Sequence, residues 1–333
     1  MTAGAIGEAA GAGVEGLSGS RAACRRVVRL RARNFYYGLR LTPEPKRSAL
    51  YAVYAWMRVA DDLVDGDVAP RFSACDRRRA LASFWSRTEM VFGGGGGGVD
   101  DGVWLGEGGC WPCWEALADA VSRYGLEESD FRAVIDALDV DLAAEGKGGG
   151  GGGPSVLFGT MSGLERYCRG VASAVGVICV RVWGYRGAGE WGRVRELASR
   201  RGLAFQLTNV LRDIGEDAGM GRCYIPWELL CSHGLEPGAL AGWDEPGACA
   251  ALVEELVHLT RSHYAASSEL DRLVHRDGAA TLWAMTRIYR GVLERVARDP
   301  RLSVGVGGGA RLSGPAKAGI AAAAVVRSAA GVR

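Results

Sequence analysis

Apolar residues recur three and four positions apart along most of this chain, which is the spacing of one face of an α-helix. One clear stripe of this kind joins Leu50, Tyr54, Met57 and Val64. The same spacing runs through FRAVIDALDVDLAAEG, LERYCRGVASAVGVICVRVWGY, ACAALVEELVHLTRSHYAASSELDRLV and AATLWAMTRIYRGVLERVA. No stretch shows a convincing alternation of apolar and polar residues, the pattern of a strand. The pattern predicts an all-α domain of several long helices over residues 22–297.

Two glycine tracts interrupt the helical pattern, at residues 93–98 and 148–153. Glycine runs have no side chains to pack and a high backbone entropy, so we expect flexible Gly-rich loops near residues 93–109 and 146–154. Neither tract leads into a Gly-Lys-Ser/Thr sequence or a strand–GxGxxG–helix unit, so neither is predicted to bind phosphate.

Small residues dominate both ends of the chain. Residues 1–21 lack the basic and apolar regions of a signal peptide, and we expect a disordered N-terminal lead there. Residues 298–333 are rich in glycine and alanine and are expected to form a loose tail. The longest apolar run in that tail, AGIAAAAVV, is far shorter than the ~20 residues that span a bilayer. We therefore expect no transmembrane helix and leave peripheral membrane contact open.

Composition narrows the class of protein. Hydrophobic residues make up 48% of the chain, which suits a globular protein with an apolar interior. With 40 basic and 38 acidic residues the net charge is +2, so we expect no nucleic-acid partner. The nine cysteines are odd in number and irregularly spaced, which predicts a reduced, cytoplasmic chain.

Four aspartates form two pairs with a spacing of four. Asp61 and Asp65 lie in RVADDLVDGD, and Asp213 and Asp217 lie in LRDIGED. Residues four apart share one face of a helix, so each pair places two like charges together and needs full solvation or a counter-ion. Asp61 also continues the apolar stripe before it, where a carboxylate is costly unless it is paired or bound to metal. Asp62 lies on a different face and is expected to be a surface or salt-bridge residue.

The second pair belongs to a longer polar stripe. Its members are Gln206, Asn209, Asp213 and Asp217. The apolar arc beside it consists of Leu203, Leu207, Val210 and Ile214. The polar stripe should therefore border a packed interface, where a cavity between helices would lie. Carboxylate and amide oxygens suit Mg²⁺, which typically bridges one or two carboxylates to substrate phosphates.

Arginines accompany both acidic pairs. Arg58 lies three residues before Asp61, and Arg212 adjoins Asp213. Each could supply the positive charge that a diphosphate leaving group needs. The competing interpretation is a solvated acidic face with local salt bridges.

Several segments resemble the squalene/phytoene synthase family, the head-to-head prenyl transferases. They are NFYYGLRLTPEPKRSALYAVYAW, YAVYAWMRVADDLVD, ERYCRGVASAVG and QLTNVLRDIGEDAGMGRCYIP, and the resemblance spans residues 31–297. It implies an all-α isoprenoid-synthase helical bundle with a central cavity. It also implies Mg²⁺-dependent condensation of two farnesyl or geranylgeranyl diphosphates through a cyclopropyl diphosphate, to presqualene diphosphate, squalene or phytoene.

The resemblance also assigns roles to residues. The metal-binding positions that it implies are Asp61, Asp65, Asn209, Asp213 and Asp217. The arginines on the diphosphate side are Arg58, Arg212 and Arg222, with Arg33 offered as a substitute because Asn34 replaces a serine of the family. The residues that line the reaction cavity are Tyr54, Tyr167, Gln206, Tyr224 and Tyr289.

Several questions stay open at the level of sequence. Mg²⁺ is the expected ion, with Mn²⁺ as a substitute, and NADPH is expected only if the product is reduced squalene. The resemblance does not choose between the C15 and C20 substrates or say whether the reaction stops at the cyclopropyl diphosphate. We expect a monomer that hands its product to downstream isoprenoid enzymes. The alternatives are a non-catalytic assembly factor on the same fold and another all-α Mg²⁺-dependent pyrophosphohydrolase.

Overall fold

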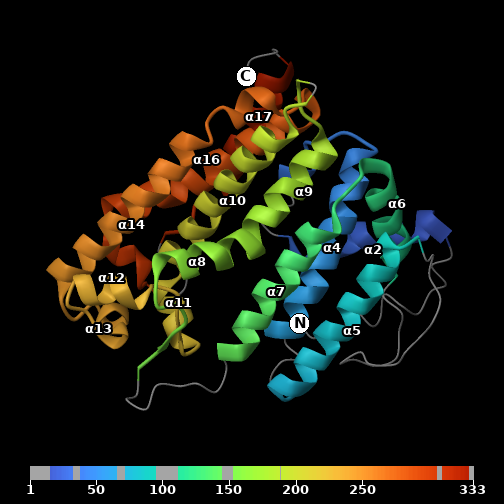
Figure 1. Cartoon of the computed structure of the whole chain (residues 1–333). Helices are drawn as coiled ribbons and strands as arrows, with labels where there is room; N and C mark the ends of the chain where they lie inside the picture. The colour runs from blue at the N-terminus through green and yellow to red at the C-terminus, as the bar shows by residue number, and fades with distance from the viewer. Residues whose placement is uncertain are drawn as a thin grey trace.

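The computed structural model describes residues 16–32, 38–65, 72–94, 112–144, 153–187, 189–305 and 310–329. Nearly all of this part of the chain is helical, and the long helices pack side by side (Figure 1). The larger helices are α2 (Gly16–Arg31), α4 (Lys46–Asp65), α5 (Ala74–Phe92), α6 (Trp114–Tyr124), α7 (Glu128–Ala144), α8 (Met161–Cys168), α9 (Ala174–Trp183), α10 (Trp191–Arg212), α14 (Pro246–Ala266), α16 (Arg276–Arg298) and α17 (Gly314–Ala329). The all-α class predicted from the apolar spacing is confirmed.

Short elements connect these helices. The helical ones are the π-helical turn η3 (Arg169–Ser173), α11 (Ile214–Gly219), α12 (Trp227–Ser232), α13 (Pro237–Gly242), α15 (Leu270–Leu273) and the 3₁₀ turn η4 (Pro300–Ser303). The two strands of the described residues, β1 (Ser155–Val156) and β2 (Arg222–Cys223), pair in parallel. None of the helices in the described ranges has the length and apolarity needed to cross a bilayer.

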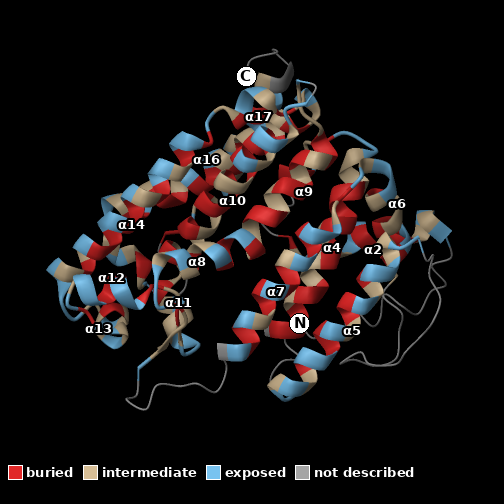
Figure 2. Cartoon of the chain, in the orientation of Figure 1, coloured by how far each residue is buried: buried red, intermediate tan, exposed pale blue. Residues whose placement is uncertain are grey.

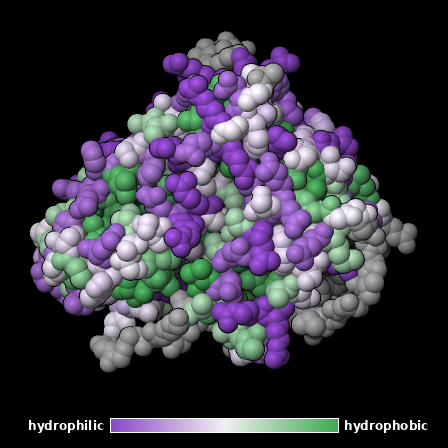
Figure 3. Space-filling model, in the orientation of Figure 1, coloured by the Kyte–Doolittle hydropathy of each residue, from purple (hydrophilic) through white to green (hydrophobic). Residues whose placement is uncertain are grey.

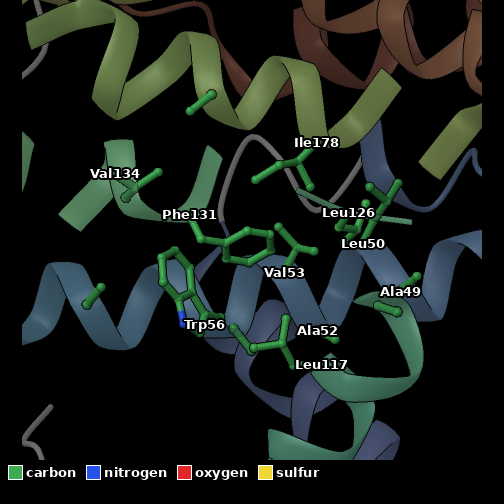
Figure 4. Packing of buried hydrophobic residues seen from close by; sticks show 14 of the residues in the cluster. Ala49, Leu50, Ala52, Val53, Trp56, Leu117, Leu126, Phe131, Val134 and Ile178 are labelled. Atoms are coloured by element: carbon green, nitrogen blue, oxygen red, sulfur yellow. The ribbon is translucent and has the colours of Figure 1, made fainter. Parts of the chain in front are cut away.

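One half of the core gathers around Trp56 of α4 (Figure 4). The Trp56 ring meets Phe131 of α7 edge-on, with centroids 4.8 Å apart, and lies 5.6 Å from Phe84 of α5. Its indole Nε1 donates a hydrogen bond of 2.9 Å to Thr88 Oγ1, so the buried polar end of the ring is satisfied. These contacts bind α4, α5 and α7 into one unit.

The other half of the core surrounds α10. Leu203, Leu207 and Leu211 are fully buried along this helix, and they belong to one hydrophobic cluster with buried residues of α14 and α16. Arg201 is 3% exposed and fixes the same helices by polar contacts, since it donates to Ser267 Oγ at 2.9 Å and to Thr286 Oγ1 at 2.7 Å. Figure 2 shows the result, with buried residues on the inward faces of the helices and exposed residues outside.

Two glycines bring η3 unusually close to its neighbours. A Cβ atom on Gly202 of α10 would lie 2.6 Å from Ser173 Cα, and one on Gly170 would lie 2.6 Å from the Ala133 carbonyl oxygen of α7. Both distances are shorter than real carbon contacts, so only glycine fits at either position. The π-helical turn is thereby wedged between α7 and α10. Such turns are rare and occur often at functional sites.

Both expected terminal segments differ from the structure. Residues 16–21 were placed in a disordered lead, but they begin α2, where buried Ser20 accepts a hydrogen bond of 3.0 Å from the Ala116 N–H. Residues 298–333 were expected to form a loose tail, yet η4 and α17 occupy much of this stretch and pack against α16. Alanine is the strongest helix former, and its small side chain permits close packing. A segment rich in alanine can therefore form a packed helix, which the expectation of a loose tail did not consider.

The expected glycine loops fall mostly on residues 95–111 and 145–152, which lie outside the described part of the chain. The expectation that they are flexible remains a prediction. The same holds for residues 1–15 and 330–333 of the expected lead and tail.

We expect Gly202→Ala to lower the free energy of unfolding by about 1–3 kcal/mol, the usual cost of inserting a methyl group into a packed contact. The matched control is Gly192→Ala on the same helix, where a Cβ would meet no atom within 4 Å. The control should leave the free energy of unfolding unchanged or raise it slightly. Urea unfolding followed by circular dichroism measures both, and equal stabilities for the two variants would contradict the wedge.

Candidate active site

The first acidic motif, Asp61 with Asp65, lies at the C-terminal end of α4. Arg58 Nη1 lies 2.9 Å from Asp61 Oδ2, and the same guanidinium also binds Asp62. Asp61 keeps 46% of its side chain exposed, so its carboxylate reaches solvent while it is paired. The side chain of Asp65 and the whole of Arg33 lie outside the described residues. Their predicted roles remain predictions.

Asp62 is the more deeply buried of the neighbouring aspartates. It was expected to be a surface or salt-bridge residue, and only the salt bridge is confirmed, because Asp62 is 9% exposed. Its Oδ1 lies 2.8 Å from Arg31 Nη2 and also binds Arg58. Helix α2 packs against α4 and delivers Arg31, a contact between distant parts of the chain that a helical wheel of α4 alone does not show.

Tyr54 lies one turn before Arg58 on α4. Burial raises the pKa of its phenol to about 12, and the charges of Arg58 and Asp61 act on it in opposite directions. The hydroxyl therefore keeps its proton at neutral pH. The structure thus brings Tyr54 to the first acidic motif, as predicted.

The second acidic motif begins where α10 ends. Asp213 leaves the helix with φ −108° and ψ 12°, and α11 then carries Asp217. The predicted polar stripe is therefore interrupted by a break in the helix, although the Asp217 N–H still donates to the Asp213 carbonyl at 2.8 Å. Arg212 binds both carboxylate oxygens of Asp213, with Nε 2.7 Å from Oδ1.

Two oxygen groups in this motif lie in unfavourable surroundings, one an amide oxygen without a hydrogen-bond partner among the described residues and the other a carboxyl with a raised pKa. Asn209 donates from Nδ2 to Gln206 Oε1 at 3.1 Å, while its buried Oδ1 has no hydrogen-bond partner there. Burial and the neighbouring Asp213 together raise the pKa of Asp217 to about 7, against the opposing charge of Arg222. A cation would satisfy the amide oxygen and stabilise the Asp217 carboxylate.

These oxygen donors fit Mg²⁺, which takes carboxylate and carbonyl ligands. Over the described ranges, no three His, Cys, Asp or Glu side chains come together in an arrangement that would hold a metal by themselves. In the second motif the candidate ligands are the carboxylates of Asp213 and Asp217 together with the amide oxygen of Asn209.

Tyr289 comes to the same motif from α16. It is 6% exposed and stacks on Phe205 with ring centroids 4.6 Å apart. Burial raises the pKa of its phenol, while Arg212 and a hydrogen bond with Asn209 act in the opposite direction. The structure thus places Tyr289 beside the second acidic motif, and its predicted role in lining the reaction cavity remains a prediction.

Tyr167 and Tyr224 form an aromatic cluster with Phe158. The two tyrosine rings have centroids 5.4 Å apart, and Phe158 lies 5.3 Å from Tyr167. Both phenols bind one carboxylate, because Tyr167 donates to Asp141 Oδ2 at 2.9 Å and Tyr224 donates to Oδ1 at 3.0 Å. Sequence analysis missed Asp141. Its signal was weak, since it occurs among other acids in an ordinary helical stretch.

Basic residues from the C-terminal segment complete the second motif. Arg311 Nη2 lies 2.7 Å from Glu216 Oε2 on α11. Burial lowers the pKa of Lys317 on α17, and the positive charges of Arg311 and Arg212 lower it further. Lys317 therefore belongs to a concentration of positive charge that favours an anionic ligand. Both residues were assigned to a loose tail and were missed for that reason.

The two acidic motifs occupy the same end of the bundle. Helix α4 begins beside the end of α9, where Lys46 Nζ donates to the Trp183 carbonyl at 2.6 Å, and α10 begins a few residues later in the chain. Both helices then run toward the lower side of Figure 1 and carry their aspartates at that end.

A groove of about 730 Å³ lies between α7, η3 and α10 and reaches Tyr167 and Phe158. On the face shown in Figure 3, green apolar patches lie low in the middle of the molecule between purple polar surfaces.

Known proteins share both the sequence and the fold. A profile of the squalene/phytoene synthase family matches residues 28–316. The presqualene diphosphate synthase of Rhodopseudomonas palustris is 32% identical over 291 residues, which cover 84% of this chain and 90% of that protein. The phytoene synthase of Mycobacterium tuberculosis is 32% identical over 311 residues, which cover 91% of this chain and 89% of that protein.

Among solved structures, a dehydrosqualene synthase in complex with a ligand superposes with a TM-score of 0.72 at 23% identity, over 93% of this chain and 96% of that chain. A squalene synthase from Alicyclobacillus acidocaldarius gives a TM-score of 0.67 at 24% identity, over 85% of this chain and 94% of that chain. These likenesses confirm the predicted isoprenoid-synthase fold. The chain belongs to the squalene/phytoene synthase family of prenyl transferases.

Proposed function

We propose that this protein is a Mg²⁺-dependent enzyme that joins two farnesyl or two geranylgeranyl diphosphates head to head. The product would be presqualene diphosphate, a squalene or phytoene, formed through a cyclopropyl diphosphate. The observation that supports this most directly is the second acidic motif. It combines the Asn209 amide oxygen, which has no hydrogen-bond partner among the described residues, and the Asp217 carboxyl, whose pKa is raised, with the positive charges of Arg212 and Lys317. Such a site suits a divalent ion and a diphosphate together.

In the proposed reaction one substrate ionises first. The bond between C1 and the diphosphate oxygen breaks, and the electron pair leaves with the diphosphate. Arg212, Arg222 and Lys317 stabilise the negative charge that develops there, because preorganised cations act most strongly in a partly buried site. A bound Mg²⁺ would add Lewis-acid charge at the same oxygens.

The chain's aromatic groups then act on the allylic cation. The C2–C3 double bond of the second substrate attacks it, and loss of a proton closes the cyclopropane ring. Ring faces attract a cation at short range, which suits Tyr54, Tyr167 and Tyr289 as its neighbours. Their raised pKa values keep these phenols neutral, so they do not add a second ion to the site.

The two relatives compared above are named for different products, and both are 32% identical to this chain. Sequence identity therefore favours neither the C15 nor the C20 substrate. NADPH enters the proposal only for a reduced squalene product. Because the product is long and apolar, the proposal also includes peripheral contact with a membrane when the product is released. The rival assembly-factor and pyrophosphohydrolase hypotheses predict no prenyl condensation, and the first experiment separates them.

A product assay tests the reaction directly. The purified chain with Mg²⁺ should convert either farnesyl diphosphate to a C30 product or geranylgeranyl diphosphate to a C40 product, with diphosphate released. Parallel reactions with and without NADPH, followed by mass spectrometry, distinguish a cyclopropyl diphosphate from a reduced hydrocarbon. If neither substrate is consumed under any of these conditions, the proposed function is wrong.

Replacing either acidic motif should abolish most turnover. We expect Asp61→Ala and Asp213→Ala each to lower kcat/KM by at least about 100-fold, because each removes a charge needed to hold the metal and diphosphate. Asp139→Ala is the matched control, since Asp139 is exposed, pairs with Arg78 at 2.6 Å and is not among the residues that line the groove. Steady-state rates on the consumed substrate measure the effect. Wild-type rates in both motif variants would contradict the assignment.

The raised pKa of Asp217 predicts that Mg²⁺ binding depends on pH. A carboxyl with a pKa of about 7 is mostly protonated at pH 6 and mostly ionised at pH 8. Because a proton and Mg²⁺ compete for it, the apparent Mg²⁺ affinity should rise about tenfold from pH 6 to pH 8. Isothermal titration with MgCl₂ measures this rise. Asp217→Asn should remove it, and a rise that survives in this variant would show that another group is responsible.

A further inference from the structure

Asp141 is a buried carboxylate that the proposed chemistry has not used. It lies near the end of α7 and is 2% exposed. Burying a carboxylate is unfavourable unless hydrogen-bond donors or positive charges stabilise it, so a buried carboxylate indicates a structural or functional role. The two phenols of Tyr167 and Tyr224 donate to its two oxygens, at 2.9 Å and 3.0 Å.

The surrounding backbone holds this arrangement in place. Tyr224 follows β2, whose pairing with β1 continues in a hydrogen bond of 3.0 Å from the Leu157 N–H to the Cys223 carbonyl. The Phe158 carbonyl accepts a further bond of 2.9 Å from the Trp227 N–H. Tyr167 itself lies in the last turn of α8, directly before the wedged turn η3.

The cluster adjoins the second acidic motif. Tyr224 and Asp217 line the same small pocket together with Arg222. The charge of Asp217 also acts on the Tyr224 phenol. Asp141 therefore lies one side chain away from groups placed beside the diphosphates.

The hydrogen bonds decide how each phenol can act. A phenol carries a single hydrogen. Each phenol lies within hydrogen-bond distance of an Asp141 oxygen, and the two phenols also lie within hydrogen-bond distance of each other. In the arrangement proposed below, both hydrogens are directed to Asp141. Only the oxygen lone pairs and the ring faces remain for any other neighbour, and these are the electron-rich parts of the group. Burial raises the pKa of both phenols, and Asp141 raises it further, so neither acts as a tyrosinate at neutral pH.

We propose that Asp141 is a positioning residue that acts through Tyr167. It turns the lone pairs of the phenol toward the reacting cation and receives the phenol's own hydrogen when the phenol takes a proton from the substrate. This inference rests on the proposed function and extends it, because it assigns a role to Asp141, a residue that the family resemblance did not single out.

The proton balance is complete within these groups. The substrate C–H bond breaks, and its electron pair closes the cyclopropane ring. The proton goes to the Tyr167 oxygen while the hydrogen that Tyr167 held passes to Asp141 Oδ2. The cation is thereby discharged, the phenol is neutral again, and Asp141 is a neutral carboxylic acid until it releases the proton to solvent. Tyr224 holds the second oxygen and fixes the orientation of the carboxylate throughout.

Asp141→Asn tests the proposal, because it keeps the volume and removes the charge. We expect kcat to fall by about 100-fold or more, the usual contribution of a positioned proton acceptor, with KM little changed. Cations that are not discharged should be captured by water, so the share of prenyl alcohol among the products should rise. In a chain that already carries Tyr167→Phe, adding Asp141→Asn should lower kcat by less than about a further threefold. The reason is that both substitutions remove the same proton transfer.

Matched variants separate this role from a structural one. Asp139→Asn lies two positions away on α7, where Asp139 is exposed and pairs with Arg78 at 2.6 Å, and it should retain wild-type rates and products. Tyr167→Phe keeps the carboxylate and should reproduce the fall in kcat and the rise in prenyl alcohol, so it carries the test if Asp141→Asn does not fold.

The proposal is overturned if Asp141→Asn or Tyr167→Phe retains the wild-type kcat. It is also overturned if the effects of the two substitutions multiply in the double variant. Substrate consumption by the wild-type chain is the separate check on the proposed function. A wild-type chain that consumes neither farnesyl nor geranylgeranyl diphosphate refutes that function and this inference with it.

Discussion

Buried carboxylates that lie close together need positive charge beside them, and this requirement governs the end of the bundle that carries the two acidic motifs. At the second acidic motif the requirement is only partly met. Arg212 binds Asp213, but the pKa of Asp217 remains raised to about 7 and the Asn209 amide oxygen has no partner among the described residues. The protein thus keeps a local excess of oxygen donors, which a metal ion would relieve.

Helices at both ends of the chain supply charge to this end. Helix α2 contributes Arg31 to Asp62, and the segment around α17 brings Arg311 to Glu216 and Lys317 near Arg212. The positive charges of Arg311 and Lys317 repel each other, and a bound anion would reduce this repulsion. If a cation and a polyanion bind together at this end of the bundle, as proposed, each would improve the site for the other.

Local patterns allowed much of this structure to be predicted from sequence. The spacing of apolar residues predicted the long helices, and the acidic pairs with their adjacent arginines predicted both motifs, because residues three or four apart on a helix are neighbours whatever the fold. Arg31, Asp141 and Lys317 could not be found in this way. Each acquires its role from a contact between distant parts of the chain. The helical wheel likewise placed Asp61 inward without showing that α2 covers Asp62.

The fold connects a close contact between helices to the cluster of candidate phenols. Gly170 and Gly202 let η3 lie against α7 and α10, and this turn begins two residues after Tyr167. Because α7 also carries Asp141, the contact that holds η3 to α7 sets the distance between the phenol and its carboxylate. An allylic cation is discharged by any water or base within reach, so the groups around it must be fixed before it forms. A rigid wedge beside the aromatic cluster meets that condition, while the charged end of α10 and α11 keeps the groups that would draw off the diphosphate.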